Sequence, residues 1–422
     1  MMEPSDLQIK GKAIIYLIII IYLASILFAG TNLAKSNNVI KSKKLVKGRL
    51  PRILSDGNEL YIIYRPQQIE GPGTKRGVIG KYTDSTCQNI GWLGNNSEKI
   101  SYYGDSSNLM TYSDETYLLY SEKLVDSPNS DLWHIDSYLI REDKHNKITT
   151  TLENANYFEP AFINFNQTNY IFYTKSNPKT GDSHISYSII KNETSVSKSN
   201  LITSRTSGIT SLYPKVLDDN LLLFYHGFDK EKGSSIWLTK YNGRNWSEPT
   251  LISKTRISPQ ISLFSNEIYV FWEVESSGNI FVKIYNGEQW SGPNEIYGKK
   301  NRGFHVEIIN NHLSFHVFND KNSLSSYDFI NGDLIDSESI TISGEVYNVD
   351  TAVYDDKIWI FYDDGEYIRY ITYDGESFDY AEAIGGDDEE TNIIVRYWWL
   401  IAMAGVIAVL LAGYRYRKKG ER

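Results

Sequence analysis

The stretch KYNGRNWSEPTLIS, residues 240–253, is followed by IYNGEQWSGPNEIY, residues 284–297. Both stretches run from an aromatic residue through Asn-Gly and two polar residues to Trp-Ser, and then reach Pro and an apolar tail. The same phrase written twice indicates an internal repeat. Because Asn-Gly supplies the two positive φ angles of a type I′ turn at little steric cost, the phrase predicts a hairpin turn in each copy.

The repeat extends over residues 48–385 with a period of roughly 45–55 residues, the range of propellers and solenoids. Each copy has a short apolar strand, a polar turn such as Asn310-Asn311, an aromatic alternating strand and, after a longer loop, a third strand. The Asn-Gly turn then leads to a fourth strand, opened by Trp246, Trp290 or Phe378. The aromatic strands are LYIIY (60–64), TYLLY (116–120), NYIFY (169–173), LLLFY (221–225), IYVFW (268–272), LSFHV (313–317) and IWIFY (358–362).

Four antiparallel strands in each of seven copies predict an all-β fold, a seven-bladed β-propeller. Six blades are the alternative, because the first two copies are less regular than the fourth to the seventh. The composition agrees with an all-β fold, since aromatic residues make up 14 % of the chain, with 32 Tyr, 9 Trp and 16 Phe among its 422 residues. A closed ring would also hide the sheet edges that a linear stack exposes.

Two apolar runs flank the repeat, at residues 13–30 and 397–413, and each is near the ~17–25 residues that span a bilayer as a helix. The aromatic start and basic end of the second run predict a cytoplasmic C-terminus and a propeller on the extracellular side of the cell membrane. The predicted segments are a cytoplasmic N-terminus (1–12), a transmembrane helix or signal peptide (13–30), a basic stalk (31–47), the propeller (48–385), an acidic linker (386–394), a transmembrane helix (395–414) and a basic cytoplasmic tail (415–422).

Several classes of function are disfavoured by composition. The net charge is −9 and no basic stripe crosses the middle of the chain, which argues against a nucleic-acid partner. The single cysteine, Cys87, excludes an intramolecular disulfide framework and a Cys-rich zinc site. The seven histidines have no tight ligand spacing, and no phosphate-binding loop or dinucleotide fingerprint occurs. We therefore expect no metal and no cofactor.

The turns YNGRNWSEP (241–249), YNGEQWSGP (285–293) and YDGESF (373–378) resemble degenerate forms of the Asp-box repeat of sialidase-like propellers, and also the Trp-bearing blades of propeller lectins. The resemblance covers residues 48–385 in architecture and implies a propeller. Sialidases bind the substrate carboxylate with three arginines. Only Arg52 in LPRIL (50–54) approaches the first of them, with Pro before it, and the other two have no match. The resemblance thus carries no catalytic residue to this chain.

A candidate site follows from the architecture. In a propeller, the starts of the inner strands and the ends of the second strands surround one mouth of a central funnel. These positions hold aromatic, carboxylate, amide, cationic and His side chains, the types that bind sugar rings and hydroxyl groups. The candidate ligand-binding residues are Arg65, Tyr157, Glu159, Tyr213, His226, Glu273, His305, Asp350 and Asp363.

The sequence therefore predicts a membrane-anchored, cell-surface binding or interaction module for glycan or protein ligands, with the lipid bilayer as a further partner. One alternative is a diverged sialidase-like glycoside hydrolase, for which Glu159, Glu273, Asp350 and Asp363 could supply two carboxylates. Another is a structural component of the cell envelope. Four Asn-x-Ser/Thr sequons give candidate glycosylation sites at Asn95, Asn166, Asn192 and Asn245.

Overall fold

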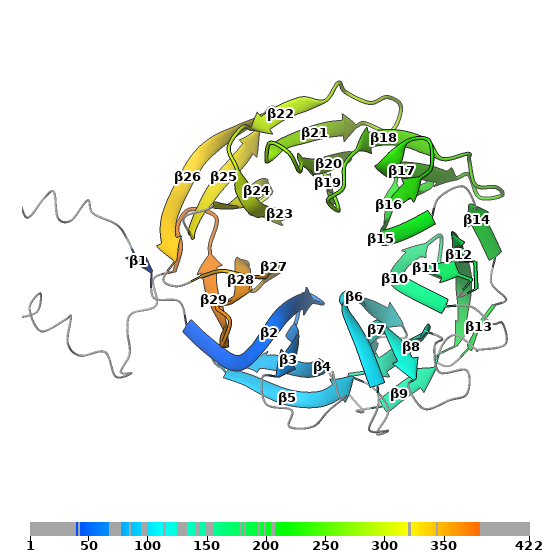
Figure 1. Ribbon diagram of the computed structural model, residues 1–422, viewed down its shortest axis with the longest axis horizontal. Helices are drawn as coiled ribbons and strands as arrows, with labels where there is room; N and C mark the ends of the chain where they lie inside the picture. The colour runs from blue at the N-terminus through cyan, green and yellow to red at the C-terminus, as the bar shows by residue number, and fades with distance from the viewer. Residues whose placement is uncertain are drawn as a thin grey trace, which may run out of the picture. The chain divides into compact units, whose positions relative to one another are not determined.

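The computed structural model describes residues 39–40, 43–66, 77–83, 86–93, 100–112, 115–124, 133–140, 144–147, 156–177, 179–180, 182–192, 195–197, 200–203, 207–319, 322–342 and 345–379. All regular structure in these ranges is β-strand, and the sheets form a ring around a central opening (Figure 1). This confirms an all-β propeller. The propeller lies in the first of two units of the chain, Met1–Tyr380, and the second unit, Ala381–Arg422, lies outside the described residues.

The two apolar runs, 13–30 and 397–413, also lie outside the described residues. In the described part of the chain, no helix has the length and apolar character needed to cross a membrane. The flanking transmembrane helices therefore stay predictions.

The strands form six hydrogen-bonded sheets. Four of them are β6 (Ile100–Tyr112), β7 (Glu115–Leu124), β8 (Trp133–Leu139) and β9 (Lys144–Lys147); β10 (Asn156–Phe165), β11 (Thr168–Ser176), β12 (Ser183–Asn192), β13 (Ser195–Val196) and β14 (Asn200–Thr203); β15 (Ser207–Leu217), β16 (Asn220–Asp229), β17 (Gly233–Tyr241) and β18 (Thr250–Lys254); and β19 (Gln260–Phe264), β20 (Glu267–Val274), β21 (Asn279–Tyr285) and β22 (Asn294–Tyr297). The fifth contains β23 (Asn301–Ile309), β24 (His312–Asn319), β25 (Ser323–Ile330), β26 (Asp333–Ile342) and β1 (Val39–Ile40). The sixth has seven strands, in the order β27 (Val349–Tyr354), β28 (Lys357–Asp363), β29 (Tyr367–Tyr373), β2 (Lys43–Ser55), β3 (Leu60–Pro66), β4 (Gly77–Thr83) and β5 (Thr86–Leu93).

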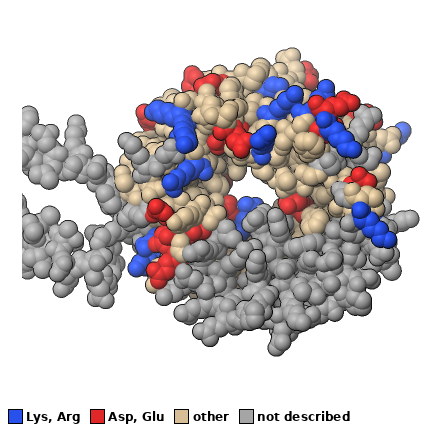
Figure 2. All heavy atoms as spheres, viewed as in Figure 1, with Lys and Arg blue, Asp and Glu red and all other residues tan. Residues whose placement is uncertain are grey.

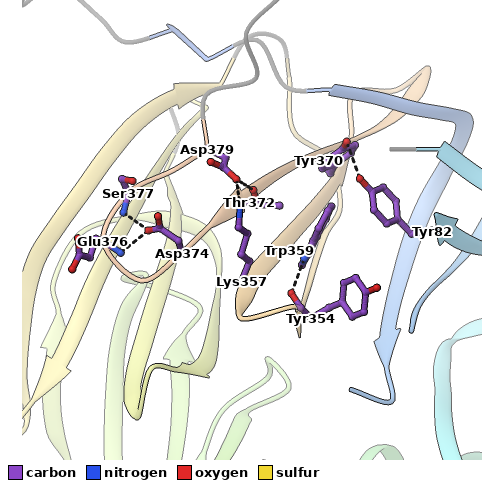
Figure 3. A network of polar contacts seen from close by, with 10 residues as sticks. All are labelled: Tyr82, Tyr354, Lys357, Trp359, Tyr370, Thr372, Asp374, Glu376, Ser377 and Asp379. Carbon is purple, nitrogen blue, oxygen red and sulfur yellow. Dashed lines mark hydrogen bonds and ion pairs between the residues drawn. The ribbon is translucent and has the colours of Figure 1, made fainter. Parts of the chain in front are cut away.

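Counted by sheets, the propeller has six blades, which is the alternative that the sequence left open. The seven-stranded sheet contains both the first and the last copy of the repeat, because the two halves of β2 pair with different neighbours. Residues 43–47 pair with β29, and residues 48–55 pair with β3. The first half of β2 thus uses residues from the range 31–47, where a stalk was expected, to close the ring. The Tyr82 and Tyr370 hydroxyls, 3.2 Å apart, add a hydrogen bond across this closure (Figure 3).

The turns between first and second strands follow the predicted hairpin chemistry. Four of them place two consecutive residues at positive φ, between 48° and 61°, which is the backbone of a type I′ turn. Asn and Asp dominate these positions because their short polar side chains tolerate the left-handed region. The four turns are Asn166-Gln167, Ser265-Asn266, Asn310-Asn311 and Asp355-Asp356.

The Asn-Gly phrase forms a different turn from the one expected. In the copies at Asn242, Asn286 and Asp374, only the following glycine has positive φ, and the Asn or Asp side chain caps a longer turn. Asn286 Oδ1, for example, accepts hydrogen bonds from the backbone N–H groups two and three residues later, at 3.0 and 2.9 Å. Asp374 makes the same two contacts (Figure 3). The two-residue type I′ turn occurs only at the Asn331-Gly332 copy, with φ of 54° and 94°.

The aromatic residue that follows each longer turn joins two blades. Trp246 makes a single β-bridge to Tyr241, and its ring lies 5.7 Å from Phe172 of the preceding blade at a 90° interplanar angle. Trp290 lies 6.3 Å from Phe224 in the same way, at 86°. The regular fourth strands begin later, at β18 and β22. The aromatic residue of the phrase is therefore a wedge between blades and not the first residue of a fourth strand.

Candidate functional site

The inner strands surround a central cavity of about 1100 Å³. They are β2, β6, β10, β15, β19, β23 and β27, and each contacts the next around the ring. Figure 2 shows the opening at the centre of the ring, with acidic and basic atoms on its edge. Binding pockets for small molecules usually measure about 300–1,000 Å³, so the cavity is large enough for a sugar chain of a few units.

Four consecutive inner strands place a different polar or aromatic side chain at the same structural position of the cavity wall. Each of these residues stands five positions before the first residue of its hairpin turn and lines the cavity. The residues and the starts of their turns are Tyr213 and Asp218, Gln260 and Ser265, His305 and Asn310, and Asp350 and Asp355. The scaffold of the repeat is thus maintained while the side chain at this position changes from blade to blade.

An ion pair joins the last residue of this series, Asp350 on β27, to Arg52 on β2, the neighbouring inner strand. Asp350 Oδ1 lies 3.4 Å from an Arg52 guanidinium nitrogen, and Asp350 Oδ2 accepts a 2.8 Å hydrogen bond from the backbone N–H of Ile53. Both carboxylate oxygens therefore have donors from β2, which holds the carboxylate in one orientation on the cavity wall. Arg52 is the residue that approaches the first sialidase arginine, and its described ion pair is with a residue of the protein itself.

A second pair of charged groups lies two residues closer to the hairpin turns. Glu307 on β23 and Lys215 on β15 both line the cavity and interact electrostatically. Burial raises the pKa of Glu307 to about 7, the nearby Asp350 adds to this, and a 2.5 Å hydrogen bond from Thr351 Oγ1 opposes it. Burial lowers the pKa of Lys215, and Glu307 opposes that change. The Glu307 carboxyl is therefore a group that holds its proton close to neutral pH.

The other polar groups of the wall are mostly neutral. The Tyr213 hydroxyl shares hydrogen bonds with Ser211 and Ser258, whose hydroxyls are 3.0 Å apart, and burial raises its pKa. Burial lowers the pKa of His305, which favours the neutral imidazole. Together with Gln260, these residues give the cavity donors and acceptors of hydrogen bonds with little free charge. Such a wall suits a hydroxyl-rich ligand better than a highly charged one.

Of the nine residues predicted for the funnel, Glu159, Tyr213, His305 and Asp350 line the cavity. Three others are buried and are not among the lining residues. His226 is buried, with Nδ1 2.8 Å from Thr210 Oγ1 and Nε2 2.9 Å from the Thr255 carbonyl oxygen. Glu273 is buried, which raises its pKa, and Asp363 is 1 % exposed and accepts a 2.6 Å hydrogen bond from Asn348.

The side chains of Arg65 and Tyr157 lie outside the described part of the structure, although their backbones belong to β3 and β10. Of the four predicted glycosylation sites, the structure likewise describes the side chains of only some. Asn166 and Asn245 are exposed in turns, whereas Asn95 and the side chain of Asn192 are not described. Among the residues that are described, no group of three or more His, Cys, Asp or Glu side chains is arranged to hold a metal ion.

Sequence reasoning missed Lys215, Glu307 and Thr351. It took the starts of the inner strands and the ends of the second strands as site positions, and these three residues lie further along the inner strands. The signal was present in the segments PKVL (214–217) and HVEI (305–308), where one charged residue interrupts an apolar inner strand. A charged side chain at a buried strand position needs a partner or an internal cavity, and here it has both.

No known family model matches the sequence, and no curated protein is significantly similar to it. Solved structures do share its fold. A prolyl endopeptidase is 11 % identical with a TM-score of 0.50, covering 79 % of this chain and 49 % of its own, so the chain spans about half of that enzyme. A polysaccharide lyase of family PL25, an ulvan lyase solved with a bound -[GlcA(1-4)Rha3S]- unit, is 12 % identical with a TM-score of 0.51, covering 79 % and 94 %.

An α-L-arabinofuranosidase from Lactobacillus brevis is also similar, at 11 % identity and a TM-score of 0.36, covering 60 % of this chain and 88 % of its own. At these identities the likeness shows the β-propeller fold alone. The resemblance to sialidase-like propellers in particular stays a prediction, and the chain is placed by comparison only as a β-propeller.

Proposed function

We propose that this protein is a cell-surface binding module that holds a carbohydrate ligand in the central cavity of its propeller. The observation that carries the proposal is the change of side chain from Tyr213 through Gln260 and His305 to Asp350 at one repeated position of the wall. In a repeat protein, positions that serve the scaffold are repeated, whereas positions that contact an asymmetric ligand must differ.

The chemistry of the wall supports a sugar over other ligands of that size. Tyr213 and Phe158 supply apolar ring surface, and Gln260, Ser211, Ser258 and Thr210 supply neutral hydrogen-bonding groups, all on one cavity. Sugar rings combine apolar C–H faces with hydroxyl groups that both donate and accept, so they match such a mixture. The charges of Arg52 and Asp350 are paired with each other, and Lys215 and Glu307 influence each other electrostatically.

The test is a glycan array probed with the full chain, followed by affinity measurement for any glycan that binds. Gln260→Ala is expected to weaken binding about tenfold or more, because a buried hydrogen bond to a ligand hydroxyl is lost. Gln289→Ala is the matched control, since Gln289 is an exposed glutamine of an outer turn. Binding that is equal in the two variants would contradict the proposal, and so would silence of the array.

Attachment to a membrane is the second part of the proposal, and it rests on the apolar runs at 13–30 and 397–413. We expect the full chain to stay with the membrane fraction after an alkaline carbonate wash, which removes peripheral proteins. Removal of residues 395–422, and then of 1–30 as well, should release the propeller in one or both steps. A chain that the wash extracts without any deletion would show that neither run spans a bilayer.

A second candidate function is glycoside hydrolysis, and Glu307 is the observation that favours it. A glycosidase needs a carboxylic acid that is protonated near neutral pH and a second carboxylate that is ionised. Glu307, with its pKa of about 7, and Asp350, held by Arg52, meet these needs on one cavity wall. Of the carboxylates first considered for this role, Glu273 and Asp363 do not line the cavity, whereas Glu159 and Asp350 do.

Chromogenic glycosides separate the two functions. Turnover that Glu307→Gln abolishes, with binding kept, would establish the enzyme. A chain that binds glycans and cleaves none of the panel would leave the binding module as the better description. Asp328→Asn is a suitable control for the charge change, since Asp328 lies on β25 and is not among the residues that line the cavity.

A further inference from the structure

A second polar layer lines the central cavity, closer to the hairpin turns than the layer that contains Tyr213. Three consecutive inner strands place one residue each at this level, three positions before the first residue of the hairpin turn. They are Lys215 on β15, Ser262 on β19 and Glu307 on β23. The Thr351 hydroxyl of β27 joins them through its hydrogen bond to Glu307. The layer therefore brings an amine and a carboxylic acid to one cavity.

Lys215 differs from other half-buried lysines of the ring. The Lys283 ammonium donates a 3.2 Å hydrogen bond to a backbone carbonyl oxygen, and the Lys240 ammonium contacts a tyrosine hydroxyl. In the part of the chain that the structure describes, the Lys215 ammonium has neither a hydrogen bond nor an ion pair, and its electrostatic neighbour is Glu307. Since Lys215 also lines the cavity, its nitrogen is available to a ligand there.

The surroundings of Lys215 favour a neutral amine. Burial lowers its pKa, and Glu307 opposes that change. Glu307 is itself partly protonated near neutral pH, because burial raises its pKa to about 7. The other charged groups that line the cavity are Glu159 and the pair of Arg52 and Asp350. A neutral amine has a free electron pair, so the cavity contains a nucleophile together with a proton donor.

We propose that Lys215 captures a small hydroxyaldehyde as an imine, with Glu307 as the acid of the reaction. An aldehyde carbon is an electrophile that a neutral lysine amine attacks directly. The hydroxyl part of the ligand is argued from the wall, because Tyr213, Gln260 and Ser262 offer neutral hydrogen-bonding groups. They lie on the strand of Lys215 or on the neighbouring strand β19.

The reaction releases one water molecule. The Lys215 nitrogen bonds to the aldehyde carbon, and the carbonyl oxygen takes the proton of Glu307, directly or through one water molecule. One proton of the nitrogen returns to the Glu307 carboxylate, which leaves a carbinolamine. Glu307 then protonates the new hydroxyl group, the C–O bond breaks, water leaves and the C=N bond forms. The remaining nitrogen proton restores the Glu307 acid, so one amine and one aldehyde give one imine and one water.

The test is reductive trapping on the full chain with glycolaldehyde, the smallest hydroxyaldehyde, and cyanoborohydride near neutral pH. Hydride reduces the imine to a stable secondary amine, and peptide mass spectrometry measures labelling of each lysine over time. We expect Lys215 to be labelled at least about tenfold faster than the exposed Lys299 and than Lys283, the matched half-buried lysine. Equal rates at these lysines would overturn the proposal.

Two variants test the roles of the two side chains. Lys215→Met removes the nucleophile, so the rapid labelling should disappear while labelling of Lys299 stays unchanged. Glu307→Gln removes the acid and should slow the labelling of Lys215 about tenfold or more. A carboxylate that acted by its charge alone would favour the ammonium form, so its loss would speed the labelling. Faster labelling in Glu307→Gln than in the parent would therefore overturn the role of Glu307.

The inference goes beyond the proposed carbohydrate site and does not depend on it. Glycolaldehyde has neither a sugar ring nor a glycosidic bond, so its capture requires no glycan affinity and no hydrolysis. A chain that binds glycans but labels Lys215 no faster than Lys299 would overturn this inference and leave the proposed function standing. Rapid labelling of Lys215 in a chain that binds no glycan would support the inference alone.

Discussion

The outer turns and the cavity wall are two regions built from the same repeat, and they differ in how the copies vary. At the outer turns, Trp246, Trp290 and Phe378 have the same structural role. Each follows a turn that an Asn or Asp side chain caps, and each packs between two blades. At the wall, one repeated position holds four different side chains. The difference shows that agreement between copies marks what the ring needs to hold together, whereas disagreement marks where the protein meets something without that symmetry.

The largest expected effect is on the wedges. Phe378→Ala should lower the free energy of unfolding by about 3–4 kcal/mol, because a fully buried ring between two blades leaves a cavity that neither blade can close. Phe378 is 1 % exposed. Equilibrium unfolding in urea measures the change, and Phe228→Ala is the control, since Phe228 is 46 % exposed. Equal losses in the two variants would mean that the wedge has no special place in the ring.

The next effect concerns charge in the cavity wall. The folded-state pKa of Glu307 is raised to about 7 from the model-compound value of 4.5, so the folded protein holds this proton when the unfolded chain has released it. The contribution of the group to stability is therefore fully present below about pH 4.5 and is lost as the pH rises through 7. Glu307→Gln should be about 3 kcal/mol more stable than the parent at pH 8 and similar to it at pH 4.5.

Thermal unfolding at both pH values measures this difference. A Glu307→Gln variant with the same advantage at pH 4.5 and pH 8 would show that the carboxyl titrates normally. Thr351→Val refines the test, because it removes the 2.5 Å hydrogen bond that favours the ionised form. It should move the loss of stability to still higher pH.

A smaller effect separates the two kinds of Asn-Gly turn. Asn286→Gly should cost about 1–2 kcal/mol, since the Asn286 side chain accepts two backbone hydrogen bonds and the position has no positive φ. Asn331→Gly should stay within about 0.5 kcal/mol of the parent, because Asn331 has a φ of 54°, which glycine adopts freely. Urea unfolding of the pair measures the contrast, and equal costs would contradict the assignment of two turn types.

The smallest effect on stability is expected at the wall position itself. Gln260→Ala should change the free energy of unfolding by less than about 0.5 kcal/mol, because Gln260 is half-buried on an open cavity and supports no wedge or turn. The same variant is expected to lose ligand affinity. A large loss of stability in Gln260→Ala would show that this wall position supports the fold, which would contradict the difference between the two regions.

Much of the fold could be predicted from sequence because it is encoded locally. Alternating aromatic residues predict the positions of the strands, and polar pairs such as Asn310-Asn311 predict the hairpin turns. The structure has strands and turns at these positions. The type of the Asn-Gly turn could not be predicted in the same way. The choice between a two-residue turn at Asn331 and a capped four-residue turn at Asn286 depends on the aromatic residue after it and on the blade it must cover.

Only part of the candidate site could be predicted from the sequence. Residues at the starts of inner strands, such as Tyr213 and His305, were placed on the cavity as predicted, because strand order defines their position. The ends of the second strands were not, since His226 and Asp363 are buried, have hydrogen-bond partners inside the protein and do not line the cavity. Whether a polar side chain at a strand end faces a cavity or a neighbour is decided by packing, which the order of residues does not show.

The sequence by itself determined the repeat, the hairpins and the wedge residues, because each depends on a few contiguous side chains and the backbone angles they favour. Only the tertiary structure decided how the ring closes and which charges meet inside it. Residues 43–47 complete the last sheet, and Arg52 pairs with Asp350 across 298 positions of the chain. Such contacts form only when all the sheets that separate these residues along the chain have packed together, so no local sequence pattern can predict them.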